Sequence, residues 1–397
     1  GGSPTLQQHS QTLLQHPRNR RMAMIKLLIV DDSALMRRQL STLFQNESEF
    51  VLRQARNGRE AIELNREFLP DVITLDINMP EMDGLTALSL IMLERPVPVI
   101  MVSSLTEQGA LATFEALNLG AVDYVAKPGG TISLSIADIR DELLGKVRAA
   151  ARAKPRAIGS KPAGNPGSKP GATKSATPLA PTSAQTSSSA SPRLTQRRLA
   201  IPHRHASDGV LVIGVSTGGP RTLEDILPLL NADFPWPVLV AQHMPAVFTK
   251  SFAERLNQIC ALEVVEANCP MPIEAGRIYI AKGGADLLVV RRGGKLVLIN
   301  KPEDKAVLWH PSVELLARSV LEYYPPTQVT AVMLTGMGYD GADAFTRIKQ
   351  GGGQTIAESQ ESAVVFGMPA ELIERGGASL VLPADKIAAQ LNAWAAR

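Results

Sequence analysis

Short apolar runs that end in polar residues recur along the chain, and a segment of helical spacing separates each run from the next. Residues 25–30 lead into Asp31-Asp32, and residues 72–75 lead into Asp76. Such runs are typical of buried parallel strands, and their alternation with helices predicts an α/β fold. The same alternation returns in the second half of the chain. We therefore expect two α/β domains, each a doubly wound parallel sheet.

A change in composition separates the two series. Residues 161–192 consist almost wholly of Lys, Pro, Ala, Gly, Ser and Thr, and such a segment cannot bury enough apolar area to offset the entropy of ordering. The sequence predicts four parts: a disordered leader or expression scar at 1–23, a folded unit at 24–144, a long flexible basic linker rich in Pro, Ser and Ala at 145–207, and a second folded unit at 208–397. Within the second unit, residues 287–290 and 296–299 predict a short antiparallel hairpin.

The net charge of +3 hides a strong segregation. Residues 24–142 carry 10 Lys or Arg and 18 Asp or Glu, a balance of −8; residues 208–397 carry 16 and 20, a balance of −4. Two acidic folded units argue against nucleic-acid binding. No apolar run approaches the ~18 residues that cross a bilayer, and two cysteines without a secretory signal favour a cytoplasmic protein.

Polar side chains follow four strands of the first unit, at the ends where ligands gather in a doubly wound sheet. They are Asp31 and Asp32, then Asp76, then Ser103, then Lys127. Three carboxylates offer the hard oxygen ligands that Mg²⁺ prefers, and a lysine can neutralise phosphate charge. The set predicts phosphoryl transfer to Asp76. The alternative is that these acids merely cap helices, which Asp32 alone could do.

This block resembles a response-regulator receiver domain over about residues 24–144. The resemblance implies a flavodoxin-like fold and a Mg²⁺ requirement for phosphorylation. It implies these residue roles: Asp76 as phosphoacceptor, Asp31, Asp32, Asp76 and the Asn78 carbonyl as magnesium ligands, Ser103 and Tyr124 as the switch pair, and Lys127 as the phosphate-binding lysine.

The second unit opens with Gly-x-Ser-x-Gly around Ser216, at a predicted strand-to-helix turn. This pattern can hold a nucleophilic hydroxyl above a sheet, or form a glycine-rich turn that binds phosphate. Only two of the six histidines, His243 and His310, fall in this unit. His243 follows a predicted strand and is our candidate base; His310 is left as a substrate contact or a core residue.

An acid must orient a catalytic imidazole, and Asp340 follows another predicted strand. Its alternative role is that of a helix cap or turn residue. The backbone N–H groups of Thr217 and Met337 are the candidate oxyanion donors. The order Ser216, His243, Asp340 differs from that of α/β-hydrolases, but geometry rather than order defines a triad.

The combination resembles a chemotaxis protein-glutamate methylesterase/glutamine deamidase of the CheB type. The motifs are, in order, the receiver, Gly-Val-Ser-Thr-Gly-Gly, Gln-His-Met-Pro and Gly-Met-Gly-Tyr-Asp-Gly. The resemblance implies a Rossmann-like esterase domain without cofactor, and Ser216, His243 and Asp340 as nucleophile, base and orienting acid. It implies hydrolysis of glutamate γ-methyl esters and deamidation of glutamines on chemotaxis receptors, with a histidine kinase as phosphodonor and an enzyme peripheral to receptor arrays.

The resemblance also implies that the unphosphorylated receiver covers the esterase site. Because both units are acidic, we expect the covering contact to be local and apolar. Three other functions compete with this one. A DNA-binding response regulator does not fit the size and charge of the second unit, and a lipase-like esterase does not fit the residue order. A phosphate-binding module without hydrolysis remains the main alternative.

Overall fold

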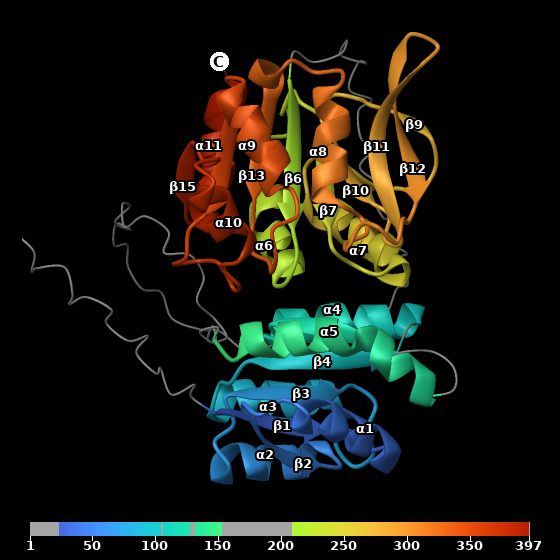
Figure 1. Cartoon of the computed structure of the whole chain (residues 1–397), viewed down its shortest axis with the longest axis vertical. Helices are drawn as coiled ribbons and strands as arrows, with labels where there is room; N and C mark the ends of the chain where they lie inside the picture. Colours follow the sequence, from blue (N-terminus) through green and yellow to red (C-terminus); the bar gives the residue numbers. More distant parts are fainter. Residues whose placement is uncertain (1–23, 105, 128–131, 153–208, 397) are drawn as a thin grey trace, which may run out of the picture.

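The computed structural model describes residues 24–104, 106–127, 132–152 and 209–396. The expected leader and most of the expected linker therefore lie outside the described residues. Two sheets, each flanked by helices, occupy the two ends of the molecule (Figure 1). The prediction of two parallel α/β domains is confirmed.

The first domain, called the receiver after the resemblance stated above, is a five-stranded parallel sheet of order β2-β1-β3-β4-β5. Its elements are β1 (Ile25–Val30), α1 (Ala34–Gln45), β2 (Phe50–Ala55), α2 (Gly58–Glu67), β3 (Val72–Asp76), α3 (Gly84–Glu94), β4 (Val99–Ser104), α4 (Glu107–Leu119), β5 (Asp123–Lys127) and α5 (Ile132–Ala150). The strand order reverses between β1 and β3, so the ends of these two strands form the crevice where ligands bind in such sheets.

Helix α5 differs from the prediction, because it continues six residues past the point where the sequence places the start of the linker. Val147 and Ala150 are fully buried, so this last stretch packs on the receiver instead of joining the spacer. The stretch 145–150 contains basic residues and no acidic residue, like the linker that follows, so composition alone assigned it to the linker. Arg148, for example, bonds Glu47 and Glu49 beside the sheet.

The second domain has a seven-stranded parallel sheet of order β15-β14-β13-β6-β7-β10-β8. Its strands are β6 (Val210–Val215), β7 (Val238–Gln242), β8 (Glu263–Ala267), β10 (Arg277–Ala281), β13 (Val329–Met333), β14 (Gln354–Glu358) and β15 (Leu380–Leu382). Its helices are α6 (Gly219–Ile226), α7 (Ala246–Ile259), α8 (Val313–Leu321), α9 (Ala342–Gln350), α10 (Met368–Glu374) and α11 (Ala384–Ala395), with 3-10 turns η1 (Leu227–Leu229) and η2 (Pro326–Gln328). Here the order reverses between β6 and its neighbours β7 and β13, which places a second crevice at their carboxyl ends.

The expected hairpin is present and forms a separate small sheet. Strands β11 (Ala285–Arg292) and β12 (Lys295–Pro302) pair antiparallel, and the short β9 (Met271–Pro272) adds a third strand. The hairpin strands have eight residues each, longer than predicted, and the turn uses Gly293 and Gly294, both at positive φ. This turn geometry favours glycine because it has no Cβ.

Among the described helices, none is long and apolar enough to span a membrane.

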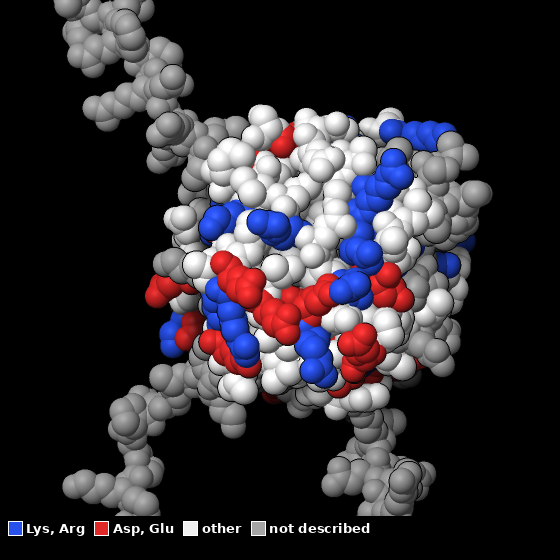
Figure 2. Space-filling model, turned by 90° about the horizontal axis from the view of Figure 1, so that it is seen from below, with Lys and Arg blue, Asp and Glu red and all other residues white. Residues whose placement is uncertain are grey.

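The surface of the receiver that points away from the second domain carries both signs of charge, as Figure 2 shows. Ion pairs on the receiver, such as Arg56–Glu60 and Arg66–Glu94, join residues of opposite sign at the surface. A nucleic-acid-binding protein typically presents a continuous basic surface instead. Such exposed pairs contribute little to stability, so the core and the sheet hold the receiver together.

The two domains meet through aromatic side chains. Helices α4 and α5 lie between the receiver sheet and the second domain (Figure 1). Phe114 of α4 stacks on Phe252 of α7 with ring centroids 5.5 Å apart, and meets Phe248 edge-on at 6.3 Å. Tyr124 of β5 packs on Phe248 at 4.6 Å. An aromatic cluster therefore forms part of the contact between the domains.

Candidate active site

Three carboxylates gather at the crevice of the receiver. Asp31 and Asp32 follow β1, Asp76 ends β3, and each offers a ligand atom within 4.8 Å of the others. The ammonium of Lys127, at the end of β5, lies 2.9 Å from Asp31 Oδ2 and 2.8 Å from Asp76 Oδ2. Gly84 lets the following loop close on this site, because a Cβ there would stand 2.0 Å from the carbonyl oxygen of Asp76.

The electrostatics of this cluster favour a bound cation. Burial raises the pKa of the Asp76 carboxyl, and the Lys127 ammonium acts against that shift. Burial alone would lower the pKa of Lys127, but the charges of Asp76 and Asp31 outweigh it and raise that pKa, so the ammonium stays charged. The cluster places three carboxylates beside a single ammonium group. Carboxylate oxygens are the ligands that Mg²⁺ prefers. The residues therefore fit a magnesium ion.

Of the remaining expected receiver residues, Ser103 and Asn78 lie near the same edge, whereas Tyr124 lies near the start of β5. Ser103 is buried near the end of β4, and its hydroxyl donates to the Gly109 carbonyl at 3.3 Å. Tyr124 is buried on β5, and its ring faces Phe248 of the second domain rather than solvent. Asn78 is exposed just past β3. The expected switch tyrosine thus lies directly in the contact between the domains.

Ser216 lies in the turn between β6 and α6, at the crevice of the second sheet. Its N–H donates to the Thr335 carbonyl at 2.9 Å, and its carbonyl accepts from Gly219 N–H at 2.8 Å. The turn needs Gly218, whose φ is +79° and which precedes the first residue of α6. Gly336 must also be small, because a Cβ there would stand 2.7 Å from Ser216 Cβ. The backbone therefore fixes the serine tightly.

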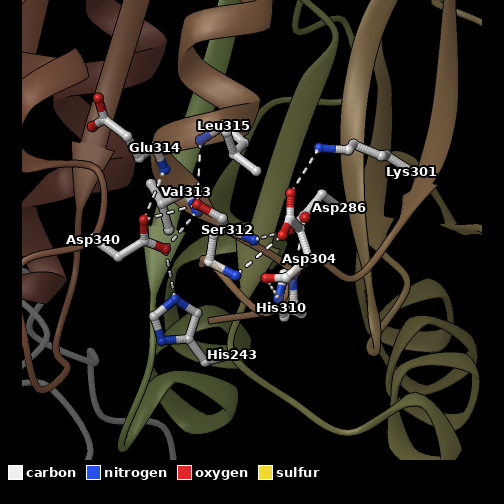
Figure 3. A network of polar contacts seen from close by, with 11 residues as sticks. His243, Asp286, Lys301, Asp304, His310, Ser312, Val313, Glu314, Leu315 and Asp340 are labelled. Carbon is white, nitrogen blue, oxygen red and sulfur yellow. Dashed lines mark hydrogen bonds and ion pairs between the residues drawn. The ribbon is translucent and has the colours of Figure 1, made fainter. Parts of the chain in front are cut away.

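His243 and Asp340 form a hydrogen-bonded pair at the same crevice (Figure 3). His243 follows β7, and its Nε2 lies 2.9 Å from Asp340 Oδ2. Within the described part of the chain, His243 Nδ1 is buried and has no hydrogen-bond partner. The pair therefore leaves one imidazole nitrogen available for a proton transfer.

Asp340 has further donors besides the histidine. The backbone N–H groups of Val313 and Glu314, at the start of α8, bond its carboxylate at 2.7 and 3.0 Å, and the Ser312 hydroxyl donates to it at 2.9 Å. Burial alone would raise the pKa of Asp340, but the His243 hydrogen bond and charge and these N–H groups hold that pKa below its ordinary value. The start of a helix stabilises a carboxylate. Asp340 therefore stays ionised at neutral pH.

The two expected oxyanion donors flank the serine. Thr217 follows Ser216 directly, and Met337 follows Gly336, which touches Ser216. Within the described ranges, the backbone N–H groups of Thr217 and Met337 donate no hydrogen bond. The receiver reaches this place as well, because a Cβ on Gly145 of α5 would stand 2.5 Å from Met337 Cε. Helix α5 thus lies against the side chain of Met337, whose backbone N–H is one of the two candidate donors.

Sequence reasoning missed three residues of the site. Ser312 contacts Asp340 directly, and the Gln242 amide donates to the carbonyls of both Ser216 and His243 at 3.0 Å. The ring of Trp309 stacks on His243, with centroids 5.7 Å apart and planes 5° apart. The position of Ser312 before an apolar helical run marks it as a helix cap, but no sequence signal links it to Asp340. His310, left open above, has Asp286 as a partner at 2.9 Å.

The fold and the site together define a class: a receiver domain joined to an α/β domain that carries a serine and a histidine–aspartate pair at one sheet crevice. Comparison with known proteins agrees. The family model described as response regulator receiver domain matches residues 27–137, and the one described as CheB methylesterase matches residues 211–391.

A protein-glutamate methylesterase/protein-glutamine glutaminase of Rhodospirillum rubrum is 53% identical over 94% of this chain and 97% of its own. One of Rhodopseudomonas palustris is 48% identical over 94% and 98%. The solved CheB methylesterase catalytic domain of Thermotoga maritima is 42% identical, covers 48% of this chain and all of its own, and has a TM-score of 0.46. The chain belongs to the family of CheB-type protein-glutamate methylesterases/protein-glutamine glutaminases, and it is a hydrolase.

Proposed function

We propose that this protein is a phosphorylation-activated methylesterase that hydrolyses glutamate γ-methyl esters on chemotaxis receptors and deamidates particular glutamines there. The observation that carries the proposal is the His243–Asp340 hydrogen bond at the crevice where Ser216 follows β6. The relatives that match almost the whole chain are named for these two activities. A phosphate-binding module would need no paired histidine and aspartate beside the serine.

The proposed reaction is an acyl transfer in two steps. The Ser216 hydroxyl oxygen attacks the γ-carbonyl carbon, and His243 Nδ1, the nitrogen that does not face Asp340, takes the hydroxyl proton. The N–H groups of Thr217 and Met337 stabilise the negative oxygen. The proton passes to the leaving group, which departs as methanol or, from glutamine, as ammonia. Water then attacks the acyl-serine with the help of His243, which frees glutamate and restores the serine.

The chemistry needs only side chains and backbone N–H groups in the second domain, so we propose that this domain works without a cofactor. In the receiver, Asp76 attacks phosphorus and Lys127 binds the transferred phosphoryl group, with a histidine kinase as the donor. Asp31, Asp32, Asp76 and the Asn78 carbonyl would hold Mg²⁺, which supplies charge neutralisation to the phosphoryl group. Ser103 and Tyr124 would respond to the phosphate, and Tyr124 already touches Phe248.

The proposed place of action is the cytoplasm, at the edge of receptor arrays. Both cysteines, Cys260 and Cys269, are free thiols, which fits a reducing compartment. The mixed surface charge of Figure 2 gives no support to a nucleic-acid partner. The receptors themselves are the partners that this proposal requires.

The test is release of methanol from chemoreceptor membranes that carry glutamate methyl esters. The full chain is incubated with them in the presence of a small-molecule phosphodonor and Mg²⁺. Methanol release above the rate without enzyme supports the proposal. If the full chain releases none, whether or not the donor is present, the substrate assignment is wrong.

The contact between the domains makes a separate prediction about regulation. Phe114→Ala removes one aromatic ring from the contact with Phe248 and Phe252, so the receiver should leave the esterase site more often. We expect basal methanol release to rise roughly tenfold, because losing an aromatic pair costs about 0.5–1.5 kcal/mol and 1.4 kcal/mol is a factor of ten in a population. The measurement is the rate without phosphodonor.

The matched control is Leu111→Ala, which truncates an exposed residue of the same helix and should leave the basal rate unchanged. With phosphodonor present, Phe114→Ala should match the wild-type protein, which shows that its catalytic domain is intact. A basal rate equal to that of the wild type would mean that this contact does not restrain the esterase.

A further inference from the structure

A second buried carboxylate, Asp286, lies behind the candidate active site. Asp286 belongs to β11 and is fully buried. Its Oδ1 accepts the backbone N–H of Ser312 at 2.8 Å, and its Oδ2 lies 2.9 Å from His310 Nδ1. Figure 3 shows both contacts converging on this one carboxylate. Asp286 therefore holds both ends of the three-residue segment from His310 to Ser312.

This segment connects to the reacting residues on both sides. On one side, the Ser312 hydroxyl donates to Asp340 Oδ1 at 2.9 Å and also caps α8, whose first N–H groups bind Asp340. On the other side, Trp309 directly precedes His310 and stacks on the His243 ring. Asp286 thus fixes the residues that touch both partners of the His243–Asp340 pair.

The far nitrogen of His310 is also held. Its Nε2 lies 3.2 Å from the Asp304 carbonyl, so both ring nitrogens face oxygen acceptors. The Asp304 side chain itself points elsewhere, toward Lys301 at 3.7 Å (Figure 3). The His310 ring, which follows Trp309 in the chain, is therefore held at two points, one of which is Asp286.

We propose that Asp286 is a positioning residue for the hydrolysis: it acts through Ser312 and Trp309 to hold Asp340 and His243 in their reactive orientation. This inference rests on the proposed function and adds a residue that touches neither substrate nor reacting atoms. The physical reason is that a misplacement of about 1 Å in such groups can cost a hundredfold in rate. Asp286 spans from the hairpin sheet to the start of α8, so it ties two parts of the domain together at the site.

The test measures the reactivity of Ser216 with a fluorophosphonate probe, in the full chain activated by phosphodonor and Mg²⁺. The Ser216 oxygen displaces fluoride from phosphorus, and His243 takes the hydroxyl proton, so the rate reports the orientation of these groups without a receptor. In Asp286→Ala, both carboxylate acceptors are removed, so the Ser312 N–H and the His310 ring lose their shared partner. We expect labelling and kcat to fall about 10–100-fold, with KM for methylated receptors within about twofold of the wild-type value. Glu303→Gln, an exposed acid on the adjoining loop, should change neither.

A second variant separates a positioning effect from a general loss of folding. Ser312→Ala leaves the Asp286 contact to the Ser312 N–H in place but removes the hydroxyl that reaches Asp340, so it should also slow labelling. Both changes act along one path. The fold-reduction in labelling rate of the double variant should therefore be smaller than the product of the two single fold-reductions. Wild-type labelling rates in either single variant, or fully multiplicative effects in the double variant, would overturn the inference. A wild-type protein that labels normally but releases no methanol would overturn only the substrate assignment, and one that does not label would overturn the nucleophile and this inference together.

Discussion

Ser216→Ala should reduce methanol release from methylated receptors by about 10⁵–10⁶-fold, leaving a residual rate above that of the uncatalysed reaction because substrate binding and the oxyanion donors remain. The proposed acyl transfer uses the Ser216 hydroxyl as its nucleophile, whereas the neighbouring Ser312 hydroxyl is bonded to Asp340. The backbone around Ser216 is held by Thr335 and Gly219, so alanine should leave the fold unchanged. The measurement is the rate of methanol release with phosphodonor present, compared with the wild-type protein.

Two observations would separate loss of chemistry from loss of structure. Ser251→Ala, in α7, changes a serine outside the crevice and should release methanol at the wild-type rate. Ser216→Ala should still bind methylated receptors and still accept phosphate on its receiver. Methanol release by Ser216→Ala within tenfold of the wild type would contradict the assignment of the nucleophile.

Asp340→Asn should lower kcat about 10⁴-fold, the size of effect seen when a triad carboxylate becomes an amide. The carboxylate accepts hydrogen bonds from Ser312, Val313 and Glu314 as well as facing His243, and an amide offers one acceptor where the carboxylate offers two. Its NH₂ group would face a donor or turn the imidazole into the wrong tautomer. The measurement is kcat for methanol release together with the thermal unfolding midpoint.

The matched control for this prediction is Asp343→Asn, three residues along the chain. Asp343 is largely exposed and pairs with Arg375 on the surface of the domain, away from His243. It should keep wild-type kcat. A value of kcat for Asp340→Asn within tenfold of the wild type, in a folded protein, would show that this acid does not orient the base.

Some of this architecture was predictable because the relevant signals are local. The apolar runs before Asp31 and Asp76 mark strands by themselves, and the ends of parallel strands share one edge, so the carboxylate cluster follows from the sequence. The same reasoning brought together His243 and Asp340, which lie 2.9 Å apart in the structure. The scarcity of histidine in the second domain left few alternatives.

Other parts depend on contacts between distant segments, which no local pattern encodes. The start of α8 binds Asp340 across 26 to 28 residues of sequence, and Asp286 reaches Ser312 across 26. The aromatic contact of Phe114 with Phe252 joins two domains that a long segment separates. Strand β10 precedes the hairpin closely in sequence, yet it pairs with β7 and β8 in the main sheet. An isolated apolar run does not reveal its neighbour in a sheet.

The central claim is that phosphorylation of Asp76 releases an esterase whose nucleophile is Ser216. The most direct measurement is the rate of methanol release from methylated receptors with and without a small-molecule phosphodonor and Mg²⁺, for the wild-type protein and for Asp76→Ala. We expect that the donor raises the wild-type rate, that chelating Mg²⁺ removes the rise, and that Asp76→Ala keeps only the basal rate. Equal stimulation of the wild type and Asp76→Ala, or no stimulation of the wild type, would contradict it.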